Sequence, residues 1–382
     1  MRRETQRLPE LLQHVSWPAL LRLAEDHGVI PLLSSALFAH GLTTLPPHDV
    51  ALQLRELQRT RALSALKLTG ELFRLTKLLK NAALEFATVK GPTLAVRAYG
   101  HAGAREYGDL DFVVRHCDVL RVHELITTTG YHAEISSQTI RAEKIPGQYL
   151  FVKTPDQILI EFHTEFTMRY FPRGLPIDDF LGRREAVSID GHEVPALATE
   201  DELILICIHG SKHLWDRLSF VADVSGLLEQ QKNLDLQRSL VVARQIGAER
   251  MLGSGLLLAR DLLRAPIPPT ISTKVSADKP VVALASQIAR RLPSGSAGSV
   301  GLLSRARYRV AMSGGGLAGM AHLARLLVSP TQEDWGRESS DPASGLPGSP
   351  NTKTQSSAFG LAPVRRIARL AKKYRRTKKS DR

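Results

Sequence analysis

The sequence predicts an α+β protein in which a small mixed β-sheet lies between an N-terminal helical segment and a C-terminal helical domain. Three observations support this fold class. Leucines recur at near-helical spacing through residues 10–80. A helical pattern returns from residue 199 to about residue 263. Between these segments, short apolar runs indicate strands at 86–89, 109–114, 131–135, 149–153 and 158–166.

The first elements follow directly from this patterning. Leucines within 52–79 mark one long amphipathic helix. The strand at 86–89 enters a Lys90-Gly91 turn, which leads into a short helix. Residues 118–128 are predicted to form a further helix, which Gly130 ends.

The strand at 109–114 carries the first chemical signal. Side chains alternate between the faces of a strand, so Asp109 and Asp111 point the same way while Leu110 and Phe112 point into the core. Two carboxylates a few ångströms apart repel each other unless a cation lies between them. The usual cation is Mg²⁺, which takes oxygen ligands and keeps waters and substrate phosphates.

A third carboxylate occurs on the strand predicted at 158–166. Ile160 and Phe162 share one face of this strand, and Glu161 and His163 share the other. A lone glutamate on a buried strand would be costly. Beside the Asp109-x-Asp111 strand, Glu161 is explained as a third metal ligand.

The elements after the sheet are mostly helical. Residues 185–189 and 194 form a hairpin-like pair, and Thr199 is predicted to cap a helix, with Glu202 completing a capping box. Prolines at 266–269 end the helical domain's first part, and further helices are predicted at 279–291 and 302–328. The predicted domains are an N-terminal helical segment (1–80), an α+β core (81–198), a helical domain (199–336), and a flexible linker with a disordered basic tail (337–382).

Charge is unevenly distributed along the chain. Residues 362–382 contain ten Lys and Arg residues and one Asp, a net +9 of the chain's +13, so the other 361 residues carry only +4. The folded body is thus only mildly basic. The tail would suit contact with an anionic membrane surface or with nucleic acid, and a disordered solubilising tail is the alternative.

Composition also restricts the compartment. No apolar run reaches the roughly 18 residues of a membrane span, and the N-terminus lacks a signal-peptide apolar core. Cys117 and Cys207 have no metal-binding spacing and are expected to be small core residues. A reducing cytoplasm is the expected location, with peripheral membrane contact through the tail as an addition.

The motifs together resemble the DNA polymerase β-like nucleotidyltransferase superfamily, and more closely a bacterial family of uncharacterised nucleotidyltransferases. The resemblance covers roughly residues 10–265, and more faintly a segment at 330–335. The matching positions are Val89-Lys90-Gly91-Pro92-Thr93-Leu94-Ala95, Tyr99-Gly100, Arg105 with Asp109-Leu110-Asp111-Phe112, Glu161-Phe162-His163, His209 with His213 and Trp215, and Asp223. The superfamily more often has Gly-Gly or Gly-Ser where this chain has Lys90-Gly91.

The resemblance implies metal-dependent nucleotidyl transfer from a nucleoside triphosphate. It implies that Asp109 and Asp111 bridge two Mg²⁺ ions and that Glu161 completes the first ion's ligands and helps to deprotonate the acceptor. Lys90, at a strand-to-helix turn, is predicted to bind phosphate, and an ordinary surface lysine is the alternative.

Three further residues have weaker assignments near the nucleotide. Gly91 is expected to allow close backbone approach. Arg105 is expected to neutralise triphosphate charge or to be an ordinary loop cation. His163 is expected to orient a carboxylate or touch the nucleotide, or else to be a histidine with its hydrogen bonds satisfied beside the site.

A set of residues in the helical domain is assigned to the acceptor side: His209, Lys212, His213, Trp215 and Asp223. The histidine pair could instead pack helix against sheet. A zinc site on this pair is disfavoured because no general-base Glu lies between the two and no third ligand is obvious. Asp223 could instead form a salt bridge with Arg217 or a neighbour.

The predicted function is therefore transfer of a nucleoside monophosphate to a hydroxyl of a small-molecule, sugar or peptide acceptor, with release of pyrophosphate. Two alternatives stay open. One is toxin-like transfer to tRNA or protein, which would require the basic tail. The other is a catalytically degenerate module that binds a nucleotide or a partner.

Overall fold

A mixed sheet forms the centre of the protein. The structure is a computed structural model that describes residues 9–141, 147–164, 176–297, 300–314, 319–320 and 324. Within these residues the strands are β1 (Phe86–Val89), β2 (Asp109–Val114), β3 (Tyr131–Ala133), β4 (Gln148–Lys153), β5 (Ile158–His163), β6 (Glu185–Ile189) and β7 (His192–Ala196). Their order is β3-β4-β5-β2-β1-β7-β6. The β2–β5 and β1–β7 pairs are parallel and the others are antiparallel, which confirms the predicted α+β class with a mixed sheet.

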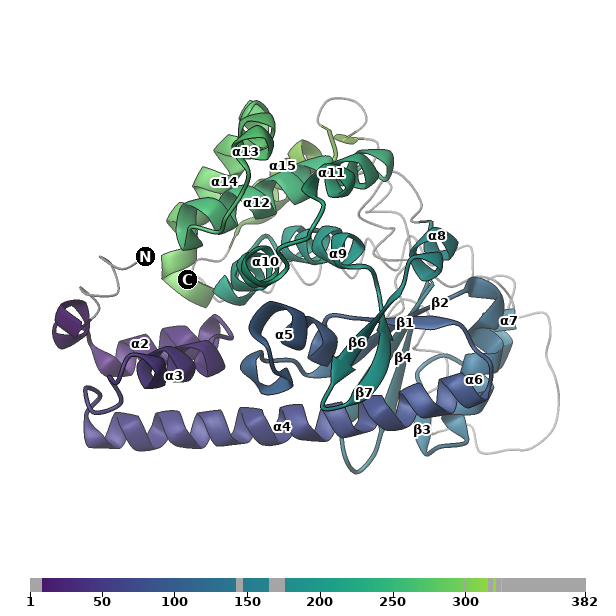
Figure 1. Cartoon of the computed structure of the whole chain (residues 1–382). Helices are drawn as coiled ribbons and strands as arrows, with labels where there is room; N and C mark the ends of the chain where they lie inside the picture. The colour runs from purple at the N-terminus through teal and green to yellow at the C-terminus, as the bar shows by residue number, and fades with distance from the viewer. Residues whose placement is uncertain are drawn as a thin grey trace.

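Helices flank the sheet in sequence and in space (Figure 1). They are α2 (Trp17–Asp26), α3 (Ile30–Ala39), α4 (His48–Asn81), α5 (Gly91–Tyr99), α6 (Val119–Thr127), α7 (Ser137–Arg141), α8 (Ile177–Gly182), α9 (Thr199–Lys212), α10 (Leu218–Gln230), α11 (Leu236–Gln245), α12 (Glu249–Leu263), α13 (Pro269–Ser276), α14 (Lys279–Arg291) and α15 (Leu302–Met312). Figure 1 shows α4 along one side of the sheet and α9 and α10 on the other, with α11–α15 stacked beyond them.

Strand alternation explains how the two sides of the sheet are filled. Phe112 and Phe162 on neighbouring strands stack at 5.0 Å between ring centroids and pack in one core with Leu72 and Leu75 of α4. The other side buries smaller strand residues, such as Val113, in one core with residues of α8, α9 and α10. Because the large side chains all face α4, the opposite face of β2 and β5 keeps room for polar residues.

The packing of α10 fixes the position of α5, the helix that follows the Lys90 turn. A Cβ atom on Gly226 of α10 would lie 2.7 Å from the carbonyl oxygen of Ala98 in α5. Any larger residue at 226 would push the two helices apart. Glycine therefore allows α10 to hold α5, and with it the turn at its N-terminus, directly against the sheet.

One local prediction is wrong. Helix α9 has Ala198 as its N-cap and no side-chain cap, so the capping box expected from Thr199 and Glu202 does not form. The Thr199 hydroxyl instead donates to Glu185, and the Glu202 carboxylate binds Arg97 and the Lys90 backbone. Tertiary partners for the glutamate outcompete the local motif.

Several predicted segments lie partly or wholly outside the described residues. These are the end of the strand expected at 158–166, most of 313–328 in the predicted helix 302–328, the segment 330–335, and the linker and tail from 337. The domain boundaries stay predictions. Among the described helices, none is both long and apolar enough to cross a bilayer.

Candidate active site

The register of β2 against β5 brings the predicted acidic residues together. In this parallel pair, Asp111 lies beside Glu161 and Val113 beside His163. Asp109 and Asp111 share one face of β2, and Glu161 and His163 share the same side of β5, opposite the face that packs on α4. Residues about 50 positions apart in the sequence thus form one polar face on the sheet.

Asp111 lies at the centre of this face and is 4 % exposed. Its Oδ2 accepts a hydrogen bond from Lys90 Nζ at 3.0 Å, and its Oδ1 lies 2.7 Å from His163 Nε2. Burial would raise the pKa of Asp111, but the Lys90 charge and the His163 hydrogen bond outweigh burial and hold this pKa well below its ordinary value. Asp111 is therefore an ionised carboxylate between the Lys90 ammonium and the His163 ring.

The pKa values of the two partners of Asp111, His163 and Lys90, are raised. Burial lowers the pKa of His163, but its hydrogen bonds to Asp111 and Glu161 raise it above the ordinary value. Burial likewise lowers the pKa of Lys90, and the charges of Asp111 and Asp109 raise it overall. The carboxylates around Lys90 and His163 thus favour the protonated form of each side chain.

Asp109 is the carboxylate whose charge is least compensated. Burial, followed by the charge of Asp111, raises the pKa of Asp109 to about 6, and Lys90 opposes the shift. The negative charge of Glu161 has two nearby partners: its Oε2 accepts from Gln148 Nε2 at 2.6 Å and lies 3.4 Å from His163 Nε2. The sequence analysis missed Gln148 because it placed the start of β4 one residue later.

The donor set fits a divalent cation. Asp111, Glu161 and His163 each offer a ligand atom, and these atoms lie within 4.8 Å of one another. Carboxylate oxygens are the ligands Mg²⁺ prefers, and Asp109 adds a further carboxylate on the same face. An imidazole nitrogen is a poor ligand for Mg²⁺ and here hydrogen-bonds Asp111, so His163 is better suited to orienting the carboxylate.

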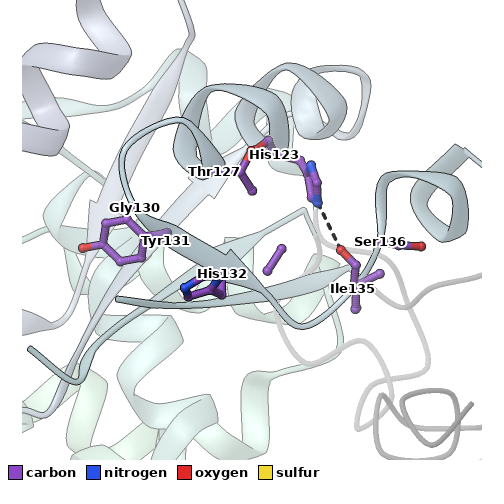
Figure 2. Close-up of a pocket in the computed structure, with 8 residues that line it drawn as sticks. His123, Thr127, Gly130, Tyr131, His132, Ile135 and Ser136 are labelled. Carbon is purple, nitrogen blue, oxygen red and sulfur yellow. Dashed lines mark hydrogen bonds between the residues drawn. The ribbon is translucent and has the colours of Figure 1, made fainter. Parts of the chain in front are cut away.

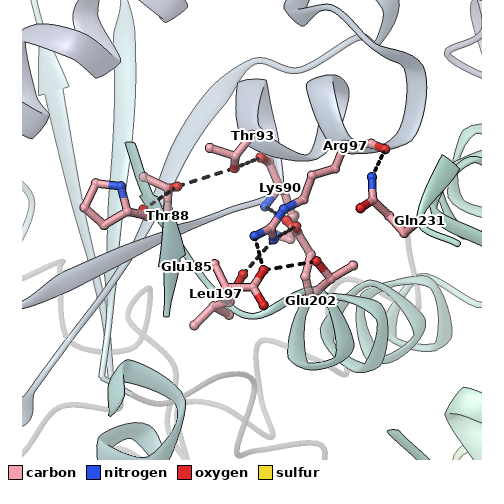
Figure 3. A network of polar contacts seen from close by, with 10 residues as sticks. Thr88, Lys90, Thr93, Arg97, Glu185, Leu197, Glu202 and Gln231 are labelled. Atoms are coloured by element: carbon pink, nitrogen blue, oxygen red, sulfur yellow. Dashed lines mark hydrogen bonds and ion pairs between the residues drawn. The ribbon is translucent and has the colours of Figure 1, made fainter. Parts of the chain in front are cut away.

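The Lys90 turn has an unusual backbone. Lys90 has φ 57° and ψ −142°, and its N–H donates to Glu202 Oε1 at 2.9 Å (Figure 3). That N–H is therefore engaged within the protein. Gly91 has φ 47°, and a Cβ at this position would meet nothing closer than 3.9 Å. The positive φ of Gly91 is a reason for glycine at this position, and the expected close backbone approach stays a prediction.

Arg105 and Asp223 form an ion pair with each other. Arg105 Nε lies 2.9 Å from both carboxylate oxygens of Asp223, and the Tyr99 hydroxyl donates to Asp223 at 2.9 Å. The side chain of Asp223 is 3 % exposed. The partner of Asp223 is thus Arg105 and not Arg217, and this pair joins the loop before β2 to α10.

The acceptor-side residues divide into two groups. The His209 and His213 rings lie 4.7 Å apart and both contact the Phe220 ring, at 5.2 and 5.7 Å between centroids. Burial, followed by the charges of Lys212 and Lys90, lowers the pKa of His213 to about 4. Burial, and then Lys90, also lowers the pKa of His209 well below its ordinary value. The Lys90 charge thus acts on both neutral rings. The sequence analysis missed Phe220, which packs against them.

Trp215 belongs to the second group because it is fully buried. A Cβ on Gly210 or Gly255 would come within 2.7 and 2.9 Å of its ring. Trp215 is therefore a core residue that two helices enclose, and its assignment to the acceptor side is wrong for this conformation. Within the described residues, no third His, Cys, Asp or Glu joins His209 and His213 in a group that could hold a metal ion.

A separate cavity of about 370 Å³ lies beside β3 and α6 (Figure 2). Its lining residues are His123, Thr127, Gly130, Tyr131, His132, Ala133, Ile135 and Ser136. In Figure 2 the His123 ring points toward Ile135, whose carbonyl oxygen lies 3.1 Å from His123 Nε2. None of the predicted site residues lines this cavity.

Comparisons with known proteins identify the family to which the chain belongs. The family model described as "Uncharacterised nucleotidyltransferase" matches residues 13–264. No curated protein matches the chain. Two solved structures are similar at low identity. The lincosamide antibiotic adenylyltransferase LnuA, with lincomycin bound, is 14% identical with a TM-score of 0.32, over 41% of this chain and 94% of that one. An antigenic nucleotidyltransferase-like protein from Paracoccidioides brasiliensis is 13% identical with a TM-score of 0.34, over 56% of this chain and 94% of that one.

The family match spans the whole of the polar face, from the Lys90 turn through β2 and β5 to α9 and α10. It covers well over half of the chain, whereas the two solved structures are too distant to add to the argument. The chain is therefore a member of the uncharacterised nucleotidyltransferase family.

Proposed function

We propose that this nucleotidyltransferase moves a nucleoside monophosphate from a nucleoside triphosphate to a hydroxyl of a small-molecule, sugar or peptide acceptor. The observation that carries the proposal is the grouping of Asp109, Asp111 and Glu161 on one sheet face beside the Lys90 ammonium. In the reaction, the acceptor oxygen forms a bond to the α-phosphorus while the bond from that phosphorus to the bridging oxygen breaks. Pyrophosphate leaves with the electron pair of the broken bond.

Three carboxylates give the site its proposed metal-binding role. Asp109 and Asp111 would hold two Mg²⁺ ions, with Glu161 as a further ligand, and the bound ions would stabilise the attacking and leaving oxygens. Glu161 would also help to remove the acceptor proton. His163 would keep Asp111 oriented through the 2.7 Å hydrogen bond described above.

Lys90 would bind the phosphates of the donor. In the structure its ammonium is bound to Asp111 at 3.0 Å, and its side chain is 16 % exposed. A triphosphate on this face would present oxygens to the same ammonium. Positioning and charge neutralisation dominate catalysis of transfer at phosphorus. A fixed cation beside the carboxylates would contribute to both.

The test is Mg²⁺-dependent pyrophosphate release with ATP, GTP, CTP and UTP in turn, with water as a slow acceptor. Wild type should release pyrophosphate from at least one triphosphate, and the Asp109→Ala/Asp111→Ala variant should not. Glu71→Gln is the matched control, since Glu71 is a buried carboxylate that lies on the α4 side of the sheet. A folded wild type that neither hydrolyses nor binds any triphosphate would favour the degenerate module.

A second experiment separates the acceptor classes. Deleting residues 340–382 removes the basic tail, and activity toward a small acceptor should be unchanged. Loss of transfer on deletion, with tRNA or protein becoming labelled only by the full chain, would favour the toxin-like alternative.

A further inference from the structure

Lys90 adopts a backbone conformation that residues with a Cβ rarely hold. Its φ of 57° with ψ of −142° falls in a region occupied almost only by glycine. A residue remains in such a conformation only where its surroundings hold it there. The question is which contacts hold Lys90, because its ammonium is the cation beside Asp111.

Glu202 of α9 provides the contact on the N–H side of this peptide. Its side chain is fully buried, and its Oε1 accepts from the Lys90 N–H at 2.9 Å. Its Oε2 accepts from Arg97 Nη1 at 2.8 Å, which fixes the orientation of the carboxylate (Figure 3). The Lys90 peptide is thus tied to a helix more than 100 residues away in the sequence.

The carbonyl side of Lys90 is held as well. Its oxygen accepts from Leu94 N at 3.0 Å and from Thr93 Oγ1 at 2.9 Å, both within the first turn of α5. With both peptide groups fixed, the side chain leaves the turn toward Asp111 Oδ2. Relaxation of φ to an ordinary value would turn the Cα–Cβ bond, and the ammonium with it, away from the carboxylates.

Charge balance for Arg97 does not by itself explain Glu202. Arg97 Nη2 donates to Glu185 at 2.8 Å, and Arg97 Nη1 also donates to the Leu197 carbonyl at 2.6 Å. Arg97 therefore has another carboxylate partner and a carbonyl partner. Among the contacts of Glu202, the bond to the Lys90 N–H is the one that reaches the active-site turn.

We propose that Glu202, oriented by Arg97, is a positioning residue that holds Lys90 in its glycine-like conformation and directs the Lys90 ammonium to Asp111 and the donor phosphates. The phosphate part of this inference rests on the proposed function. The conformational part concerns the protein alone and can be tested without any ligand.

The ligand-free test compares Glu202→Ala in three backgrounds: Lys90, Lys90→Ala and Lys90→Gly. Alanine removes the ammonium but still needs to be held at positive φ, whereas glycine does not. Glu202→Ala should therefore lower the melting temperature equally with Lys90 and Ala at position 90, and by at most about half as much with Gly, a coupling typical of residues in contact. Equal losses in the Ala and Gly backgrounds would overturn the proposal.

Two further variants keep this test decisive. Glu185→Gln removes the other carboxylate of Arg97 without touching Lys90, and its effect should be the same in all three backgrounds. If Glu202→Ala fails to fold, Glu202→Gln replaces it. Glutamine keeps the size but cannot accept from both Lys90 and Arg97, so its effect should also depend on whether residue 90 is glycine.

The functional test is calorimetric binding of Mg²⁺ with whichever triphosphate the wild type binds. Glu202→Gln should weaken binding about tenfold with Lys90 present, and much less in the Lys90→Ala background, where no ammonium remains to be directed. Unchanged affinity in Glu202→Gln would contradict the positioning role. If wild type binds no triphosphate, the proposed function fails, and the melting-temperature comparison still decides the role of Glu202.

Discussion

Two buried acidic centres lie on opposite sides of the same sheet and handle negative charge in opposite ways. On the α4 side, the single carboxylate of Glu71 accepts from Arg74 at 2.6 and 2.9 Å and from the Tyr131 hydroxyl at 2.7 Å, with Lys153 at 3.5 Å. Burial would raise the pKa of Glu71, but these partners lower it to about 2. The charge of this centre is satisfied within the protein.

The candidate active site differs because acids outnumber their partners. Asp109, Asp111 and Glu161 share Lys90 and His163, and the pKa of Asp109 rises to about 6 as a result of burial and the nearby Asp111 charge. A surplus of negative charge around the buried Asp111 destabilises the metal-free protein. The complete pairing of Glu71 is typical of a structural carboxylate, whereas the surplus charge of the candidate active site is what the proposed cation binding would neutralise.

The largest effect is expected from Asp111→Asn. This change leaves the Lys90 ammonium and the His163 ring without their central carboxylate, so unfolding free energy should fall by about 3 kcal/mol, the scale seen when one partner of a buried pair is removed. Pyrophosphate release should fall at least about 10²- to 10³-fold, the range for losing one preorganised electrostatic group. Urea denaturation and the release assay measure the two effects. Retained activity in a folded Asp111→Asn variant would remove Asp111 from the proposed chemistry.

Asp109→Asn should separate stability from activity. Since the folded-state pKa of Asp109 is raised from 3.8 to about 6, the folded protein binds this proton more tightly, and wild type loses stability as pH rises from about 4 to 6. The variant escapes this loss, so in metal-free buffer at pH 7.5 it should be about 1–3 kcal/mol more stable than wild type. At pH 4 the difference in stability should vanish. The variant should also lose pyrophosphate release at pH 7.5. A destabilised variant at pH 7.5 would contradict the surplus-charge account.

Glu71→Gln tests the satisfied centre and has the opposite sign. The pKa of Glu71 is lowered from 4.5 to about 2, so its stabilising contribution is present above about pH 4.5 and is lost as pH falls toward 2. At pH 7 the variant should be less stable by about 1–2 kcal/mol, with the difference shrinking in acid. Its affinity for Mg²⁺ and triphosphate should match wild type. Impaired metal binding in this variant would contradict the assignment of Glu71 to a structural role alone.

The smallest predicted effect is the pH dependence of metal affinity. A metal that binds Asp109 must displace its proton, so with a pKa of about 6 the apparent Mg²⁺ affinity should be roughly fourfold weaker at pH 5.5 than at pH 7.5. The thermal shift produced by Mg²⁺ at both pH values measures this difference. In Asp109→Asn any remaining Mg²⁺ binding should lose this dependence.

The sequence predicted the parts of the site that depend on strand periodicity. Asp109 and Asp111 were placed on one face of their strand, and Glu161 and His163 on one face of theirs, because alternation along a strand is a local property. The cost of a lone glutamate on a buried strand then placed Glu161 beside the Asp109-x-Asp111 strand, and the structure supplies the parallel register that joins them.

Contacts between distant helices could not be predicted in the same way. Glu202 has the spacing of a capping box, yet its partners Lys90 and Arg97 are more than 100 residues away. The pairing of Arg105 with Asp223 depends on where α10 packs. The close packing of α10 on α5 is possible because residue 226 is glycine. Such choices are made by tertiary packing, and neither spacing nor composition encodes them locally.

The most direct test of the central claim is calorimetric titration of Mg²⁺ and a triphosphate into wild type and into the Asp109→Asn/Asp111→Asn variant at pH 7.5. The account predicts that triphosphate binding to wild type requires Mg²⁺ and that the variant, folded by circular dichroism, loses the metal-dependent part. Metal-dependent binding of equal affinity in both proteins would show that the carboxylates of β2 do not form the metal site.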